Sequence, residues 1–133
     1  MKPELVGLWQ LVSAQREYAD TGEIVDMFGP NPTGYLMFAP GGRMMAILTA
    51  ANRVSVRDQQ MTAYSGTYRV DGGRWVTDVD VAWTPDWLGT KQEREFWIED
   101  GELRIRSMEL THPAAKGRRY RGLLRWRRAD NFG

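Results

Sequence analysis

Alternation of polar and apolar residues on either side of glycine turns is the feature that most constrains this sequence. In the stretch GTYRVDGGRWVTDVDVAW, residues 66–83, polar and apolar residues alternate on both sides of a glycine pair at positions 72 and 73. A period of two is the side-chain period of a β-strand, and glycines between two such runs favour a tight hairpin turn. The stretch therefore predicts a β-hairpin with one apolar face and one face in water.

The turn sets which residues of this hairpin stand opposite one another. A turn at residues 72–73 predicts that the inner face pairs Tyr68 with Thr77, Tyr64 with Val81 and Thr62 with Trp83. Gly66 lies between the two tyrosines, where its missing side chain would leave room for a ligand. Asp78 and Asp80 share the opposite face, so we expect them to face water rather than to act as a catalytic pair.

A second hairpin is predicted in KQEREFWIEDGELRIRSME, residues 91–109. The Asp-Gly pair at positions 100 and 101 is the signal of a type I′ turn, which places Phe96 opposite Ile105 on the inner face. The outer face pairs Glu95 with Arg106. Farther along the apolar face the pattern brings in polar residues, because it places Arg94 opposite Ser107 and Gln92 opposite Glu109.

The remaining chain adds strands of the same kind. Apolar and polar residues also alternate in residues 5–18, in residues 34–49 around a turn at 41–42, and in RRYRGLLRWRR, residues 118–128, where arginines point one way and aromatic residues the other. About eight antiparallel strands without a long helix predict an all-β protein, a single up-and-down barrel that removes exposed edges, with a β-sandwich as the alternative. The length of 133 residues predicts one domain, residues 1–133.

Composition narrows the function classes. The chain has no cysteine and its first residues, MKPELVGLWQ, lack the apolar run of a signal peptide or membrane anchor, so we expect a cytoplasmic protein. A formal net charge of +1 disfavours a global field built for nucleic acid or a membrane. His112 is the single histidine, in a segment expected to be a solvated loop. One histidine without cysteines predicts no metal centre, and no motif indicates a cofactor.

Four stretches together resemble the bacterial lipocalin-like domain family: GLWQLVSA, FGPNPTGYLMFAPGGRM, AYSGTYRVDGG and TPDWLGTKQERE. The resemblance covers nearly the whole chain in order. It implies a barrel whose closed end holds Gly7 and Trp9, with the indole covered by an arginine of the last strand, for which Arg125 and Arg127 are the candidates. It also implies an interior cavity for a small apolar or amphipathic molecule.

Arg94 is the first candidate for contact with such a molecule. A guanidinium among Phe96 and other apolar residues needs an acceptor, which is either a ligand carboxylate, phenolate or enolate, or Glu109 in an internal ion pair. Tyr64 and Tyr68 are candidate hydrogen-bond partners of a ligand, and they are also ordinary core aromatics in an alternative interpretation. Trp83 is a candidate wall of the cavity mouth.

Three functions remain open at this stage. The first is binding of a small apolar or amphipathic molecule; the second is an isomerase or cyclase in which Arg94 and a tyrosine stabilise an oxyanion, with no catalytic set assigned. The third is a barrel filled by side chains that acts through its outer arginines Arg119, Arg121 and Arg125. An apolar patch around residues 35–48 also makes a homodimer possible.

Overall fold

The computed structural model describes residues 5–129, and in this part of the chain one antiparallel sheet of nine strands closes on itself. The strands are β1 (Gly7–Tyr18), β2 (Ile24–Asp26), β3 (Thr33–Phe38), β4 (Arg43–Thr49), β5 (Met61–Asp71), β6 (Arg74–Ala82), β7 (Lys91–Glu99), β8 (Glu102–Leu110) and β9 (Tyr120–Arg128). Two 3₁₀ turns, η1 (Pro85–Trp87) and η2 (Pro113–Ala115), interrupt the order after β6 and β8. Residues 1–4, part of the stretch in which the sequence predicts no signal peptide, lie outside the described residues.

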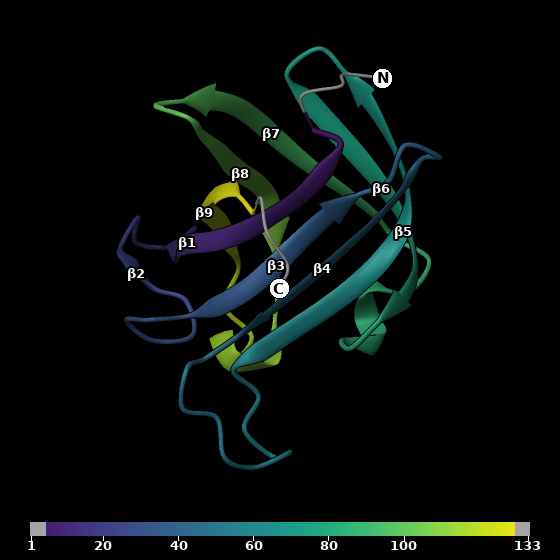
Figure 1. The fold of residues 1–133 in the computed structure, drawn as a ribbon. Coiled ribbons are helices and arrows are strands. Elements are labelled where there is room, and N and C mark those ends of the chain that lie inside the picture. Colours follow the sequence, from purple (N-terminus) through teal and green to yellow (C-terminus); the bar gives the residue numbers. More distant parts are fainter. Residues whose placement is uncertain (1–4, 130–133) are drawn as a thin grey trace.

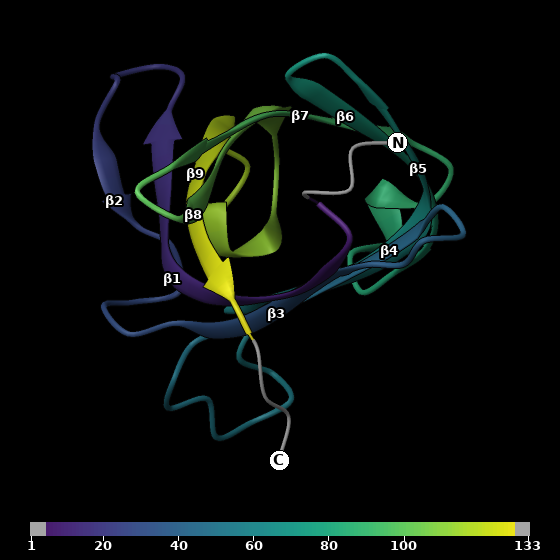
Figure 2. The ribbon, with the colours of Figure 1, turned by 45° about the horizontal axis from the view of Figure 1, so that its top comes forward.

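Pairing between the first and the last long strand closes the barrel. β1 runs antiparallel to β9 from Trp9 opposite Arg128 to Tyr18 opposite Tyr120, and Figure 2 shows the resulting ring. The short β2 pairs with the far end of β1 and lies outside the ring as an extra strand. The predicted up-and-down barrel is therefore confirmed and the β-sandwich alternative is excluded, because a sandwich would leave two separate sheets.

Both predicted hairpins are present, and the first departs from its predicted register at a β-bulge. In β5–β6 the pairs hold from Asp71 opposite Arg74 to Gly66 opposite Val79, and beyond them Tyr64 stands opposite Ala82 instead of Val81. The predicted Thr62–Trp83 pair is lost in the same shift. Gly66 explains why the strands shift here, since a Cβ at this position would collide with the carbonyl oxygen of Asp78.

The second bulge lies in β8. The hairpin β7–β8 has the predicted pairs, including Phe96 opposite Ile105 and Arg94 opposite Ser107. On the other side of β8 the register with β9 shifts between Arg106 and Glu109. The Ser107 side chain accepts a hydrogen bond from the Gly122 N–H at 2.7 Å and so takes the place of a backbone partner there. Glu109 is consequently turned away from the interior, contrary to the prediction.

The closed end of the barrel is built around Trp9. Its indole N–H donates to the Leu5 carbonyl at 3.0 Å, and the Arg128 guanidinium lies 4.1 Å from the centre of its ring. The covering arginine is thus Arg128; the candidate Arg125 lies on the outer surface, 2.7 Å from Glu102. Gly7 has a φ of +129°, and a Cβ there would come within 2.7 Å of Arg128 Nη1, so glycine is required.

The opposite end carries the two 3₁₀ turns, and η2 lies beside the start of β5, where His112 Nε2 donates to the Met61 carbonyl (Figure 1). No helix in residues 5–129 has the length and apolar character to cross a membrane. The buried apolar residues of both ends and the middle form one continuous core inside the ring.

Candidate functional site

A small cavity lies inside the barrel, between the core of the Trp9 end and the 3₁₀ turns. Its volume is about 50 Å³. Its lining is mostly apolar and comes from strands β3 to β9, from η1, from the N-cap residue of η2 and from the loop after β2. The lining residues are Met27, Phe28, Leu36, Ala46, Leu48, Thr62, Tyr64, Trp75, Trp87, Arg94, Ile105, Ser107, Leu110, His112, Tyr120, Gly122, Leu124 and Trp126. The cavity is several times smaller than a typical ligand pocket of roughly 300–1,000 Å³.

Arg94 is the charged residue in this lining. It lies on the inner face of β7 because the alternation that buries Phe96 also turns Arg94 inward, and its side chain is 5% exposed. Its guanidinium donates to the Gln92 side-chain oxygen at 3.3 Å, to the Glu93 carbonyl at 3.1 Å and to the Tyr64 hydroxyl at 3.5 Å. All three acceptors are neutral, so the charge of Arg94 is solvated by dipoles rather than paired with a carboxylate.

Aromatic rings surround the Arg94 guanidinium. Its central carbon lies 5.8 Å from the centre of the Tyr64 ring and 6.0 Å from that of Trp87. The two rings pack edge to face at 5.2 Å. Aromatic faces attract a cation, and they also hold the planar guanidinium in one orientation in which it faces the cavity.

Arg16 is a second buried arginine, and sequence reasoning missed it. Its side chain is 5% exposed, and its Nε and Nη2 atoms have no hydrogen-bond partner in the described residues. The guanidinium lies over two cavity-lining rings, 4.9 Å from the centre of Tyr120 and 5.6 Å from that of Phe28. The signal was present in the sequence, because Ala14, Arg16 and Tyr18 share one face of the first strand.

The positive charges of Arg16 and Arg94 both act on the hydroxyl of Tyr120. Its side chain is almost fully buried on β9, and burial raises the pKa of its hydroxyl above the ordinary value. The positive charges of Arg16 and Arg94 both oppose that increase in pKa. Tyr120 is therefore a protonated phenol at neutral pH, available as a hydrogen-bond donor beside two cations.

The sequence predicts a solvated loop for His112, but the residue is buried in the cavity wall. Its Nε2 donates to the Met61 carbonyl at 2.7 Å and its Nδ1 accepts the Ala114 N–H at 3.0 Å, which caps η2. Burial lowers the pKa of His112 below its ordinary value, the hydrogen bond to Met61 opposes this, and the charge of Arg16 adds to it. His112 is thus a neutral, structural imidazole at pH 7.

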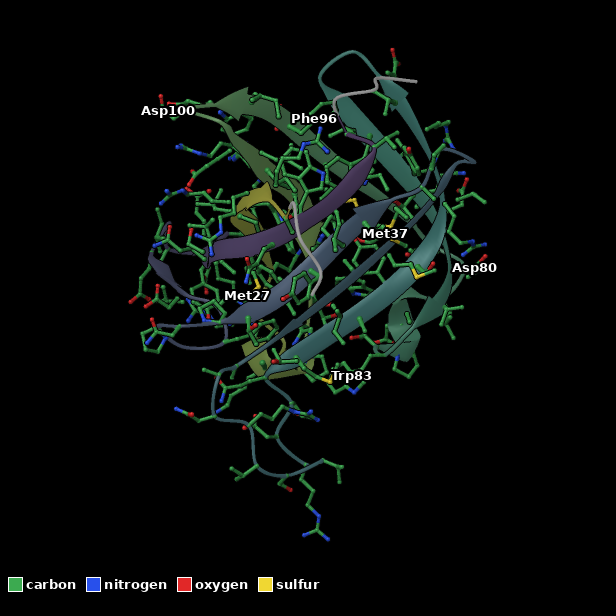
Figure 3. The ribbon with its side chains drawn as sticks, in the orientation of Figure 1. Met27, Met37, Asp80, Trp83, Phe96 and Asp100 are labelled. Atoms are coloured by element: carbon green, nitrogen blue, oxygen red, sulfur yellow. The ribbon has the colours of Figure 1, made fainter. Side chains whose placement is uncertain are left out.

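The structure separates the other predicted site residues. Phe96 and Tyr68 lie in the core toward the Trp9 end, where Tyr68 packs on Phe38 and donates to the Ala39 carbonyl at 3.3 Å. Neither lines the cavity. Trp83 lies toward the opposite end from Phe96 (Figure 3) and stacks on His112 at 5.4 Å, outside the cavity lining. Of the predicted set, Arg94 and Tyr64 are therefore brought together at the cavity.

Glu109 and Gly66 do not take the positions that were expected of them. Glu109 is on the outer surface, where it accepts from Arg119 at 2.9 Å, so the predicted internal pair with Arg94 is wrong. The bulge in β8 is the physical reason. The space beside Gly66 is filled by the backbone of Asp78 and is not open to a ligand.

Outer carboxylates and outer arginines are paired with one another. Asp78 lies 2.6 Å from Lys91 and 3.0 Å from Arg69, and hydrogen bonds from these two cations hold the pKa of its carboxyl below the ordinary value. Asp80 is held in the same way by Arg43. Among the described residues, no group of three or more histidine, cysteine or acidic side chains is placed to hold a metal ion.

Comparison with known proteins identifies a family for this chain. A family model described as "Lipocalin-like domain" matches residues 6–129. A search of curated proteins found no match. Among solved structures, a mutant of the fluorescent protein UnaG is similar at 14% sequence identity and a TM-score of 0.42, with 98% of this chain and 100% of that chain covered.

Proposed function

We propose that this chain, which belongs to the lipocalin-like domain family, binds a small and largely apolar organic molecule inside its barrel. The observation that carries the proposal is the interior cavity, with apolar walls and the polar groups of Arg94 and Tyr64 converging on it. An apolar enclosure with a few oriented polar groups is the usual construction of a small-molecule site. The apolar walls supply affinity, and Arg94 with Tyr64 fixes the orientation of the bound molecule.

The small volume of the cavity implies that side chains move when a molecule enters. Phe28 is the residue best placed to do so, because it lies on the loop between β2 and β3 and not on a strand. Its φ of +63° is a conformation that residues with side chains rarely adopt. Withdrawal of the Phe28 ring would enlarge the cavity at the wall shared with His112, whose ring centre lies 5.5 Å away.

The proposal is tested with a neutral fluorescent probe, phenylnaphthylamine, and with two phenylalanine variants of matched size change. Ala46 points into the cavity from β4, whereas Ala63, on the neighbouring β5, lines the outer surface. We expect the wild type and Ala63→Phe to bind the probe with a saturating fluorescence increase, and Ala46→Phe to bind it at least tenfold more weakly. Native mass spectrometry with organic extraction of the purified protein identifies any molecule already bound.

Two results would overturn interior binding. One is a wild type that neither binds the probe, nor retains a molecule, nor gains thermal stability with any member of a library of apolar and amphipathic compounds. The other is an Ala46→Phe variant that has a wild-type circular dichroism spectrum and unchanged probe affinity. The second result would move the binding site to the outer surface.

An isomerase or cyclase is the second candidate, and the contact between Arg94 and Tyr64 supports it. A guanidinium and a phenol that point at one place can stabilise an oxyanion that develops on a bound substrate. The extraction experiment separates the two functions, because a binding protein returns an added molecule unaltered. An enzyme converts it, and Arg94→Met then lowers the rate constant of conversion more than the affinity.

Compartment and outer-surface partners remain proposals. The lack of cysteine supports the cytoplasm as the compartment. A role for the outer arginines in binding nucleic acid has less support, because Arg119 and Arg125 are each paired with a glutamate, Glu109 and Glu102 respectively. These pairs neutralise charge that a phosphate backbone would otherwise meet.

A further inference from the structure

Two positive charges lie inside the barrel. Arg16 on β1 and Arg94 on β7 are both 5% exposed. They reach the interior from strands that are not neighbours in the sheet. A guanidinium cannot lose its proton at any physiological pH, so neither residue can avoid the cost of burial by becoming neutral.

The interior supplies no negative charge to match them. The buried polar residues of the described chain are arginine, threonine, serine, glutamine and histidine, with no aspartate or glutamate among them. His112 adds no compensation, since it is neutral or positive. Buried ions are normally paired, and a buried arginine without a carboxylate therefore indicates that the counter-charge comes from outside the chain.

Among the charged residues of the interior, Arg16 has unused hydrogen-bonding capacity. Two of its guanidinium nitrogens, Nε and Nη2, are buried and have no hydrogen-bond partner within residues 5–129. The Phe28 ring lies over this guanidinium and also lines the cavity. Movement of the same ring that enlarges the cavity therefore also uncovers two N–H groups that can donate to the two oxygens of a carboxylate or a similar group in a bidentate arrangement.

We infer that the molecule bound in the barrel is an organic anion, whose acidic group is neutralised by Arg16 and Arg94 with Tyr120 as an additional donor. The inference rests on the proposed function and adds the charge class of the ligand. Tyr120 lines the cavity, lies against Arg16 and is influenced by the charge of both arginines. An acidic group at Tyr120 is attracted by both cations, and an apolar body then extends along the remaining walls.

The test compares two probes that share one skeleton. Anilinonaphthalene sulfonate carries a negative charge, and phenylnaphthylamine is the same ring system without the sulfonate. We expect wild-type protein to bind the sulfonate at least tenfold more tightly than the neutral probe. Arg16→Met and Arg94→Met each remove a charge while keeping side-chain length, and each is expected to lower sulfonate affinity at least tenfold with little effect on the neutral probe.

Arg125→Met is the matched control, because it removes one arginine from the outer surface, where Arg125 is paired with Glu102. It should leave both affinities unchanged, which excludes a general effect of net charge. Folding of the variants is checked by thermal unfolding without ligand. The thermal unfolding midpoints of Arg16→Met and Arg94→Met should equal or exceed the wild-type midpoint, since each substitution removes a buried positive charge that no carboxylate pairs with.

The outcomes separate this inference from the proposed function. Equal affinity of the two probes in the wild type, or equal losses for both probes in the interior variants, overturns the organic anion and leaves interior binding in place. A loss of sulfonate binding in Arg125→Met as large as in the interior variants also overturns it. If neither probe binds, the organic anion is overturned, and interior binding is overturned with it when the protein also retains no molecule and gains no thermal stability with the compound library.

Discussion

At the scale of single residues, burial decides the chemistry of the site more than residue type does. His112 is 3% exposed and its two ring nitrogens are both used in hydrogen bonds to the backbone. Protonation of Nδ1 would turn an acceptor into a donor that faces the Ala114 N–H. The folded state therefore resists protonation of this residue, and the unfolded chain does not.

This difference predicts that stability falls on mild acidification. The pKa of His112 is lower in the folded than in the unfolded state, so the unfolded chain binds more protons below about pH 6.5, and the free energy of unfolding decreases as pH falls through this range. The loss is at most about 1.4 kcal/mol per pH unit. Urea unfolding of the wild type and of His112→Gln at pH 7.5, 6.5 and 5.5 checks it, and the variant should show a flatter dependence.

Other charged groups do not account for the expected change in the free energy of unfolding between pH 7.5 and 5.5. Arg16 is a guanidinium, which keeps its proton over this range of pH. The outer carboxylates with lowered pKa values, such as Asp78 and Glu102, lose their contribution at still lower pH. An equal slope in wild type and His112→Gln would show that His112 is not the group responsible.

Residue-scale features differed in how far the sequence could predict them. The inward position of Arg94 followed from alternation along its strand, and Arg16 obeyed the same rule on the first strand. The burial of His112 could not be predicted, because it depends on Trp83 and Phe28, which are distant in sequence and meet it only in the folded barrel. Loop residues are normally exposed, and this one is an exception.

At the scale of elements, short glycine turns determined pairing, and bulges limited how far that pairing extended. Each hairpin register was correct for the residues next to its turn. The first register failed where the Asp78 backbone approaches Gly66, and beyond Ser107 a bulge of β8 against β9, where Gly122 donates to the Ser107 side chain, turns Glu109 outward. Such contacts depend on packing in three dimensions, so the alternation of one strand cannot reveal them.

The bulge at Gly66 predicts a selective sensitivity to alanine. A Cβ at Gly66 would meet the Asp78 backbone and the Thr77 methyl group, so Gly66→Ala should lower the free energy of unfolding by about 2–4 kcal/mol. Gly41→Ala is the control, because a Cβ there meets nothing within 4 Å. Urea unfolding of both variants is the measurement. A change of less than about 0.5 kcal/mol in Gly66→Ala, the size of the effect of a neutral surface substitution, would contradict the prediction.

At the scale of the whole molecule, the barrel has an apolar patch on its outer surface as well as an apolar interior. The outer patch comprises Tyr35, Met37, Met45, Ile47 and Val81, all well exposed on β3, β4 and β6. They line a groove of about 620 Å³. The sequence placed an apolar patch around residues 35–48, and alternation of the two strands explains why half of those residues point outward.

We expect this patch to pair with a second copy of the chain. The ion pair of Arg43 and Asp80 borders it, and a two-fold axis can set each of these charges against the opposite charge of the other copy. Ile47→Lys should therefore shift the protein from dimer to monomer in analytical ultracentrifugation. Val56→Lys, at a residue that is 90% exposed away from the patch, should not. A wild type that is monomeric at high micromolar concentration would contradict the dimer.

Closure of the barrel by β1 and β9 also has a consequence for how the chain reaches its fold. The two strands that complete the ring are separated by nearly the whole chain, so their pairing is the contact of greatest loop entropy and contributes to a high contact order. During synthesis, β1 emerges first, and the edge of β1 that pairs with β9 stays exposed until β9 has been made. The short β2 pairs with β1 early and locally, but it covers the opposite edge, the one that β3 also pairs with, so the β9 edge of β1 stays open until the final strand arrives.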